Sequence, residues 1–182
     1  MRLWTAKVAD SLPKARNTLT QRMVAYYSDT LASIATTKME CGHMNEGDVA
    51  GLAVFQDPYA FIGIRKANGM CYIIMVNNGK TIDSSKVDGT TVYLRASAIH
   101  GSGAAPLYGG KTAKGSGTAS FSYSLDDRTF APIGNALHMR FNLRLFTGNK
   151  FCLFNYATNA LGGYVDFDWF RTGAVAPAAL RP

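Results

Sequence analysis

The sequence is poor in the features that mark helical, membrane and exported proteins. No long segment repeats apolar residues at the spacing of an α-helix, so we expect few helices. No apolar run is long enough to cross a membrane, and residues 1–4 lead into no hydrophobic segment. The sequence therefore predicts neither a membrane partner nor a signal peptide, and leaves cytoplasmic, periplasmic and secreted locations open.

Cysteine is scarce and widely spaced. The three residues, Cys41, Cys71 and Cys152, fit no zinc-binding spacing, and an odd number cannot all form disulfides. Cys152 lies between Phe151 and Leu153, so we expect it to be a buried free thiol.

Acidic residues are also few, 12 against 19 lysines and arginines, which gives a net charge of +7. The basic residues are dispersed along the chain instead of forming runs. Proteins that bind nucleic acids concentrate positive charge in patches, so we expect no nucleic-acid partner.

What is present is a succession of short alternating segments separated by Gly, Asn and Asp. This pattern, in a chain of 182 residues that is 47% hydrophobic, predicts one all-β domain, a two-sheet antiparallel β-sandwich. We expect the sandwich to span residues 1–172 and residues 173–182 to form an unstructured tail. Residues 101–117, rich in Gly, Ala and Ser, are predicted to form a surface loop. The clearest expected strands are 30–40, 49–56, 59–66, 70–76, 91–99 and 118–125.

The most informative stretch is the predicted hairpin at residues 151–171. In its second strand Val165, Phe167 and Trp169 alternate with Asp166 and Asp168. Because successive side chains of a strand point to opposite faces, we expect the three apolar residues in the core and the two carboxylates on the outer face.

Three roles are open for Asp166 and Asp168. Two steps along a strand separate their Cα atoms by about 7 Å, a spacing compatible with the acid and base of a glycosidase. Asp168 could instead ligate a structural Ca²⁺, which prefers carboxylate and carbonyl oxygens. Both could also simply accept structural hydrogen bonds, the interpretation that the sequence favours.

Sugar binding calls for aromatic faces and planar polar groups, because pyranose rings combine apolar C–H faces with hydroxyl edges. For the aromatic residues the alternative is core packing, and for the polar ones it is hydrogen bonding between strands. The candidates near the hairpin loop are Asn155, Tyr156, Asn159 and Tyr164, and those near the N-terminus are Arg16, Asn17, Gln21 and Arg22.

Several segments together resemble the C-terminal module of family 43 glycoside hydrolases, the β-xylosidase and α-L-arabinofuranosidase group. The matching segments are LWTAK (3–7), ARNTLTQR (15–22), GDVAGLAVFQ (47–56), TVYLRA (91–96), FSYSLDDRTFAPIG (121–134) and FTGNKFCLFNYATNALGGYVDFDWF (146–170).

The resemblance implies a concanavalin-like jelly roll that docks on a separate catalytic propeller. It also implies that residues 155–163 form a loop that narrows the sugar pocket of the propeller. Modules of the family usually begin before the segment that matches 3–7, so we expect an N-terminal strand to be missing. The missing segment would contain the second ligand of a Ca²⁺ bound by Asp168. The strand edge left exposed would favour pairing with another copy and thus a homo-oligomer.

The function expected from the resemblance is a non-catalytic accessory module that recognises β-1,4-xylan or arabinoxylan chains of plant cell walls and requires no cofactor. Two alternatives stay open. One is a pure docking domain for a family 43 propeller, and the other is a small glycoside hydrolase that uses Asp166 and Asp168.

Overall fold

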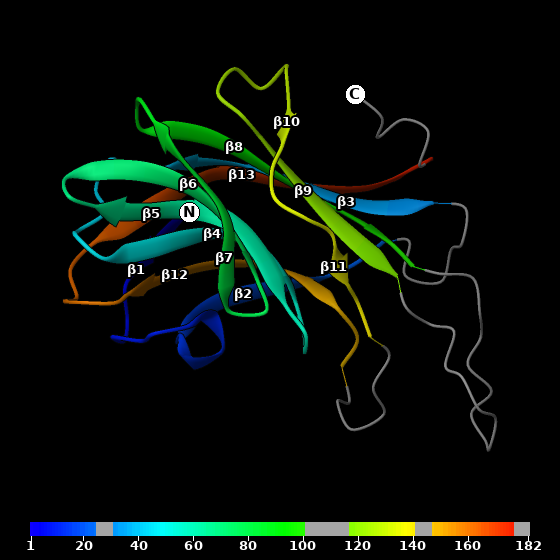
Figure 1. The fold of residues 1–182 in the computed structure, drawn as a ribbon, viewed down its shortest axis with the longest axis horizontal. Helices are drawn as coiled ribbons and strands as arrows, with labels where there is room; N and C mark the ends of the chain where they lie inside the picture. The colour runs from blue at the N-terminus through cyan, green and yellow to red at the C-terminus, as the bar shows by residue number, and fades with distance from the viewer. Residues whose placement is uncertain (25–30, 101–116, 141–146, 177–182) are drawn as a thin grey trace.

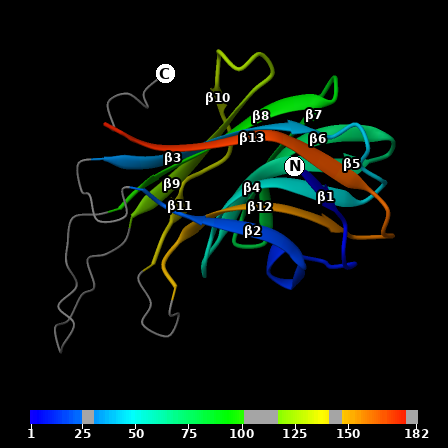
Figure 2. The same ribbon diagram turned by 180° about the vertical axis from the view of Figure 1, so that it is seen from behind.

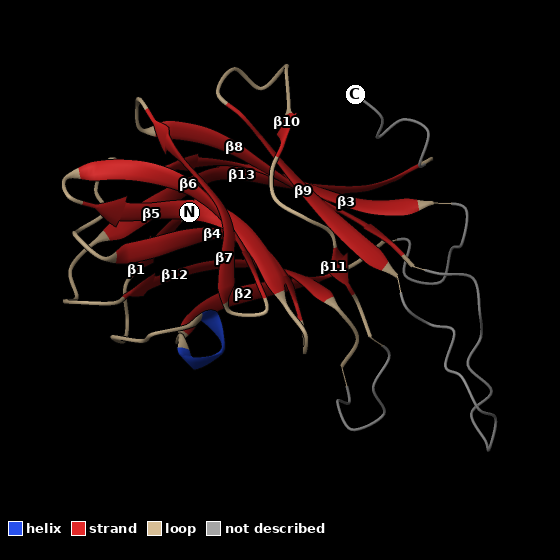
Figure 3. Cartoon of the chain, viewed as in Figure 1, coloured by secondary structure: helices blue, strands red, loops and turns tan. Residues whose placement is uncertain are grey.

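The computed structural model describes residues 1–24, 31–100, 117–140 and 147–176. Two antiparallel sheets face each other in a sandwich, which confirms the predicted fold (Figure 1). Within the described residues the one helical element is a 3-10 turn, η1 (Leu12–Lys14), and no helix there is long and apolar enough to cross a membrane (Figure 3).

The seven-stranded sheet has the order β1-β13-β3-β8-β9-β10, and β11 also pairs with β9. Its strands are β1 (Arg2–Trp4), β3 (Ala32–Glu40), β8 (Thr91–Ile99), β9 (Thr118–Ser124), β10 (Ala131–Pro132), β11 (Leu137–His138) and β13 (Tyr164–Val175). Strands from both ends of the chain therefore meet in it, with β1 along the edge beside β13.

The six-stranded sheet has the order β2-β12-β4-β5-β6-β7. Its strands are β2 (Asn17–Arg22), β4 (Asp48–Phe55), β5 (Ala60–Ala67), β6 (Met70–Asn77), β7 (Lys80–Val87) and β12 (Lys150–Ala157). Strand β7 was not predicted, because it is an edge strand with one buried residue, Val87, and therefore carries little apolar alternation.

The main core fills the space between the sheets. Each strand contributes alternate residues, such as Leu52 and Val54 from β4, Ile62 and Ile64 from β5, and Leu94 from β8, all fully buried. Cys41 and Cys71 meet in this layer, one beside each sheet, with their sulfur atoms 4.0 Å apart. All three cysteines are buried free thiols, as expected for Cys152.

A second apolar cluster lies on the outer face of the six-stranded sheet. The segment 9–15, which contains η1, runs beside β12 and β2 on the side away from β13 (Figure 2) and places Ala9 and Leu12 on this face. The sheet contributes the alternate residues that point away from the main core, namely Val49, Ala53, Tyr59, Phe61, Ile74, Val76, Cys152, Phe154 and Tyr156. We call residues 9–15 the cover segment, because they shield this sheet face from solvent. The sandwich therefore has two buried apolar layers, one between the sheets and one beneath the cover segment.

Two predictions about the last strand were wrong. A β-bulge lies between Phe167, which pairs with Met39, and Trp169, which pairs with Lys38. The extra residue reverses the alternation, so Trp169 leaves the face of Val165 and Phe167 and is half-buried on the outer side. In addition, residues 173–175 continue β13 and pair with β3, so they are not part of an unstructured tail. Residues 177–182, and residues 101–116 of the predicted loop, lie outside the described residues.

Candidate functional site

Asp166 is held by an arginine. Its carboxylate accepts two hydrogen bonds from Arg2, from Nε at 2.9 Å and from Nη2 at 2.8 Å. This bidentate pair connects β13 with β1 and lowers the pKa of Asp166. A general acid in a glycosidase needs a raised pKa, so the structure favours the hydrogen-bonded role for Asp166.

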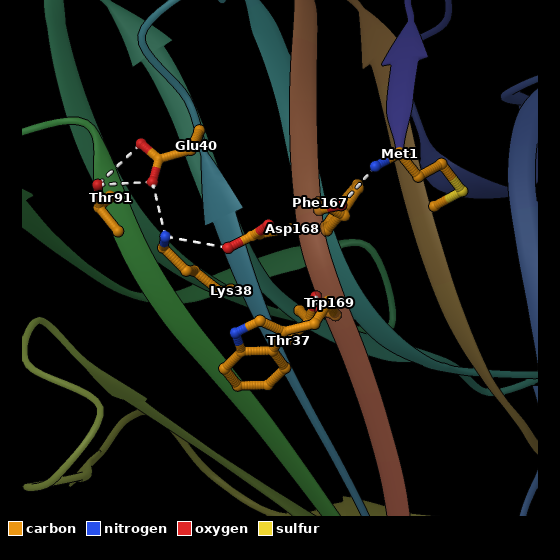
Figure 4. Close-up of polar contacts among 8 residues, drawn as sticks. All are labelled: Met1, Thr37, Lys38, Glu40, Thr91, Phe167, Asp168 and Trp169. Carbon is orange, nitrogen blue, oxygen red and sulfur yellow. Dashed lines mark hydrogen bonds and ion pairs between the residues drawn. The ribbon is translucent and has the colours of Figure 1, made fainter.

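Asp168 lies in a chain of charges on the outer face of the same sheet. Its Oδ2 accepts a hydrogen bond from Lys38 Nζ at 3.1 Å, and Lys38 also forms an ion pair with Glu40 at 3.7 Å (Figure 4). Glu40 in turn accepts a hydrogen bond from Thr91 at 2.8 Å. The carboxylate of Asp168 thus already has a cation beside it.

These contacts bear on the calcium hypothesis. No three His, Cys, Asp or Glu side chains gather around one point within the residues that the structure describes. The ammonium of Lys38 beside Asp168 would repel a divalent cation bound there. Calcium binding at Asp168 and hydrolysis by the two carboxylates both stay predictions, and the geometry favours neither.

Asn155 and Tyr156 lie at the end of β12 and are buried. Asn155 points into the sandwich and donates a hydrogen bond to the carbonyl oxygen of Leu3 at 2.8 Å. Tyr156 belongs to the second apolar cluster, is 5% exposed, and stacks beside Phe154 with ring centroids 6.0 Å apart. Neither side chain offers a surface to a sugar in this structure. The segment 9–15 lies over the sheet face that carries Tyr156, and the two sheets enclose Asn155.

The loop between β12 and β13 is anchored at several points and leaves one apolar side chain exposed. Thr158 Oγ1 donates to the carbonyl oxygen of Gly47 at 2.8 Å, and the backbone N–H of Gly162 donates to Thr5 Oγ1 at 3.1 Å. Asn159 is exposed and reaches the carbonyl oxygen of Glu46 at 3.3 Å. Leu161 is 51% exposed, so this braced loop presents it to the surroundings.

Of the predicted sugar-binding residues, Tyr164 lies in a surface cluster of aromatic and basic side chains. Its ring centroid lies 4.6 Å from that of Trp4 and 4.5 Å from that of His43, and the guanidinium of Arg2 lies 4.0 Å from the ring centre. Trp4 is 49% exposed. We call this cluster of Arg2, Trp4, His43 and Tyr164 the aromatic corner; it adjoins the loop 158–163, because Tyr164 begins β13 directly after that loop.

Two members of the aromatic corner, Trp4 and His43, were not predicted from the sequence. The sequence Leu3-Trp4-Thr5 carries no clear alternation, and only the structure shows that Leu3 and Thr5 are buried while Trp4 between them points outward. His43 had no signal, since it enters the corner from the turn after β3, where its carbonyl oxygen accepts a hydrogen bond from the backbone N–H of Tyr164.

The other candidates lie on or beside the edge strand β2 and are not gathered together. Asn17 donates a hydrogen bond to the carbonyl oxygen of Trp4, which brings it next to the aromatic corner. Gln21 and Arg22 are exposed near the far end of β2, about 15 Å along the strand. Arg16 is exposed just before β2. Of this set, only Asn17 lies close to the aromatic corner.

A buried carboxyl group supports the turn beneath the corner. Asp48 is fully buried, and its Oδ2 accepts a hydrogen bond from the backbone N–H of Asn45 at 2.7 Å. Its Oδ1 has no hydrogen-bond partner among the described residues. Burial raises the pKa of Asp48. A Cβ atom on Gly163 would lie 1.7 Å from Oδ2, so a side chain at this position is excluded and the loop can pack directly on Asp48.

The family described as the β-xylosidase C-terminal concanavalin A-like domain matches residues 1–172. The chain belongs to this family. The concanavalin-like form of the sandwich and the resemblance to family 43 modules are thereby confirmed. The comparison with curated proteins found no match.

Solved structures support the same assignment. A bifunctional GH43-CE protein from Bacteroides eggerthii has a TM-score of 0.80 and 32% identity, and the match covers 94% of this chain and 20% of that one. A GH43 glycoside hydrolase engineered to show endo-xylanase and exo-arabinofuranosidase activity has a TM-score of 0.80 and 29% identity, with 96% and 34% covered. A xylan β-1,4-xylosidase from Bacillus halodurans shares the fold, with a TM-score of 0.63 at 16% identity. The chain spans about a fifth to a third of these relatives, as an accessory domain would.

Proposed function

We propose that this module binds, and helps to enclose, β-1,4-linked xylan-type chains without taking part in a covalent step. The observation that carries the proposal is the aromatic corner, a half-exposed tryptophan supported by Tyr164 and His43 beside the loop 158–163. The family assignment supports it, since the structural relatives include xylan-degrading enzymes.

The geometry of the corner suits a sugar ring. Tyr164 is surrounded by Arg2, His43 and Trp4, so it fixes the neighbouring rings more than it offers its own face. Trp4 is the exposed member and can pack against the C–H face of a pyranose. Asn159, exposed on the adjacent loop, offers an amide to the hydroxyl groups at the edge of the sugar.

Affinity electrophoresis through arabinoxylan tests the proposal. The wild-type module should be retarded, and Trp4→Ala should migrate as in a gel without polysaccharide. Leu125→Ala is the matched control, because Leu125 is 53% exposed in the β9–β10 region, on another part of the molecule. Unretarded migration of the wild type through arabinoxylan and unsubstituted xylan would exclude glycan binding by the isolated module.

The exposed apolar side chains at the same end favour a second function, docking on a catalytic propeller. Trp4 is 49% exposed, Val8 45% and Leu161 51%, and Val8 lies beside Ala157, where the loop begins. Such residues commonly form the centre of an interface.

Sedimentation of the module with a separately expressed family 43 propeller tests docking. Leu161→Asp should abolish a complex that forms with the wild type, whereas Leu125→Asp should leave it intact. A complex that survives Leu161→Asp would place the interface elsewhere. The Leu161→Asp variant should also be run through arabinoxylan. A variant that is still retarded but no longer binds the propeller separates docking from glycan binding.

A further inference from the structure

The outer face of the seven-stranded sheet carries aromatic and basic side chains in register. We call it the open face and define it by Lys38, Tyr93, Arg95, Trp169 and Arg171. Lys38 pairs with Trp169 on one side and with Tyr93 on the other, so the three occupy one row across β13, β3 and β8. The rings of Trp169 and Tyr93 lie with centroids 6.1 Å apart at an angle of 40°. Two ring surfaces therefore flank a lysine that Glu40 and Asp168 already neutralise.

The next row brings two guanidinium groups onto the same face. Thr36 pairs with Arg171 on one side and with Arg95 on the other. Two strand spacings separate the Cα atoms of the two arginines by about 10 Å. Each guanidinium lies over a ring: Arg171 is 4.1 Å from the centre of Trp169, and Arg95 is 3.4 Å from the centre of Phe130. Arg95 Nε also donates a hydrogen bond to Thr36 Oγ1 at 3.2 Å.

No carboxylate among the described residues is bound to these arginines, although Arg95 Nε already donates to Thr36. Within the described part of the chain neither forms an ion pair, in contrast to Arg2 with Asp166 and Lys38 with Glu40 and Asp168. Burial lowers the pKa of Arg95, which reflects a partly desolvated cation that an anion would stabilise. Stacking on a ring fixes the plane of a guanidinium, so less side-chain entropy is lost when its fork binds a carboxylate.

We propose that the open face binds glycan chains that carry carboxylate groups, that is, polysaccharides substituted with uronic acids. Trp169 and Tyr93 lie against the sugar rings, and Arg95 and Arg171 receive the carboxylates. The inference extends the proposed function, since it assumes a glycan ligand, but it uses other residues than the aromatic corner, further along the same outer face of the sheet. The two surfaces would distinguish acidic substituents from the neutral chain.

Affinity electrophoresis on two xylans tests the proposal, one substituted with glucuronic acid and one with arabinose only. The wild type should bind the acidic xylan more tightly, and the excess should disappear at high ionic strength. Arg171→Gln should weaken binding to the acidic xylan about tenfold, the loss expected from removing one charge-assisted hydrogen bond, and leave binding to the neutral xylan unchanged. Arg65→Gln, an exposed cation on the six-stranded sheet, is the charge-matched control.

The outcomes separate this inference from the proposed function. Equal binding of the two xylans by the wild type, or an equal loss in Arg171→Gln and Arg65→Gln, would overturn the acidic-glycan site and leave neutral binding at Trp4 standing. Binding of the acidic xylan alone, sensitive to Arg171→Gln and insensitive to Trp4→Ala, would support the open face and overturn the corner. Arg95→Gln should weaken binding to the acidic xylan in the same way. Because Arg95 is half-buried, a thermal melt verifies that this substitution leaves the fold intact.

Discussion

The two outer faces of the sandwich are built by the same alternation of side chains, but one is covered by another segment and the other is open to solvent. On the six-stranded sheet the outward residues are apolar, and the segment 9–15 covers them to form a second dry layer. On the seven-stranded sheet most outward residues are charged, hydroxylic or aromatic and lie exposed or half-buried, although Ile34 and Ile99 also point outward. The aromatic residues therefore have different surroundings on the two faces: Tyr156 packs in a covered layer, while Trp169 and Tyr93 are partly open to solvent and belong to the proposed glycan surface.

The sharpest test of this contrast exchanges one aromatic side chain for alanine on each face. Tyr156→Ala should destabilise the fold by about 3–5 kcal/mol, because it opens a cavity in a close-packed layer. Trp169→Ala should cost clearly less, since Trp169 is half-buried and borders solvent. Urea unfolding followed by circular dichroism measures both, and equal losses would contradict the division of roles between the faces.

The cover segment itself is the next target. Leu12 is 1% exposed and packs on the second apolar cluster, so Leu12→Ala should lower the free energy of unfolding by about 2–5 kcal/mol. Lys14→Ala, two residues on and exposed, is the control and should change stability little. If Leu12→Ala unfolds at the wild-type urea concentration, the segment does not stabilise the sheet beneath it.

A smaller effect is expected at the buried carboxyl group below the aromatic corner. Burial raises the pKa of Asp48 in the folded protein, so the destabilising charge is absent in acid and develops as the pH rises through that value. Asp48→Asn keeps an acceptor for the backbone N–H of Asn45 and removes the charge. The variant should melt higher than the wild type at neutral pH, and the difference should shrink as the pH falls. Asp88→Asn, whose side chain is 93% exposed, should show no such trend.

The smallest effect is expected for the ion pair at the edge of the open face. Arg2 lowers the pKa of Asp166, so its stabilisation is present above the unfolded pKa of about 3.9 and is lost as the pH falls through the folded value. Arg2→Gln should raise the pKa of Asp166, seen by NMR titration of its carboxyl carbon, and cause a slight loss of thermal stability at neutral pH that vanishes in acid. An unchanged titration would show that the pair does not form in solution.

Much of the fold could be predicted because burial on one side of a strand leaves a period of two in the sequence. Strand β8 was predicted with the bounds that the structure has, 91–99. Whether the other side of a strand is covered leaves no comparable signal, so Tyr156 was proposed as a sugar platform although the distant Leu12 lies in the segment that covers its sheet face. The bulge after Phe167 is likewise invisible to alternation, and one extra residue moved Trp169 from the expected core to the surface.

The candidate site was predicted only in part. Tyr164 and Asn159 were proposed from residue type near a loop, and both lie on or beside the surface where the loop meets β1. The ring partners of Tyr164, Trp4 and His43, come from positions 160 and 121 residues away in the chain, a proximity that the folding of the chain creates. Spacing within one segment cannot show which distant residues complete a site.

The sulfur atoms of Cys41 and Cys71 lie 4.0 Å apart between the sheets, so their reactivity can serve as a probe for separation of the two sheets. Burial raises the pKa of Cys41 to about 12, so at neutral pH a thiol reagent finds almost no thiolate there while the layers stay together. Once the sheets separate, Cys41 and Cys71 become reactive in the same event, because one belongs to each side. The rate at which an added reagent modifies them therefore follows the separation of the sheets, and docking on a propeller or occupation by a glycan would slow it.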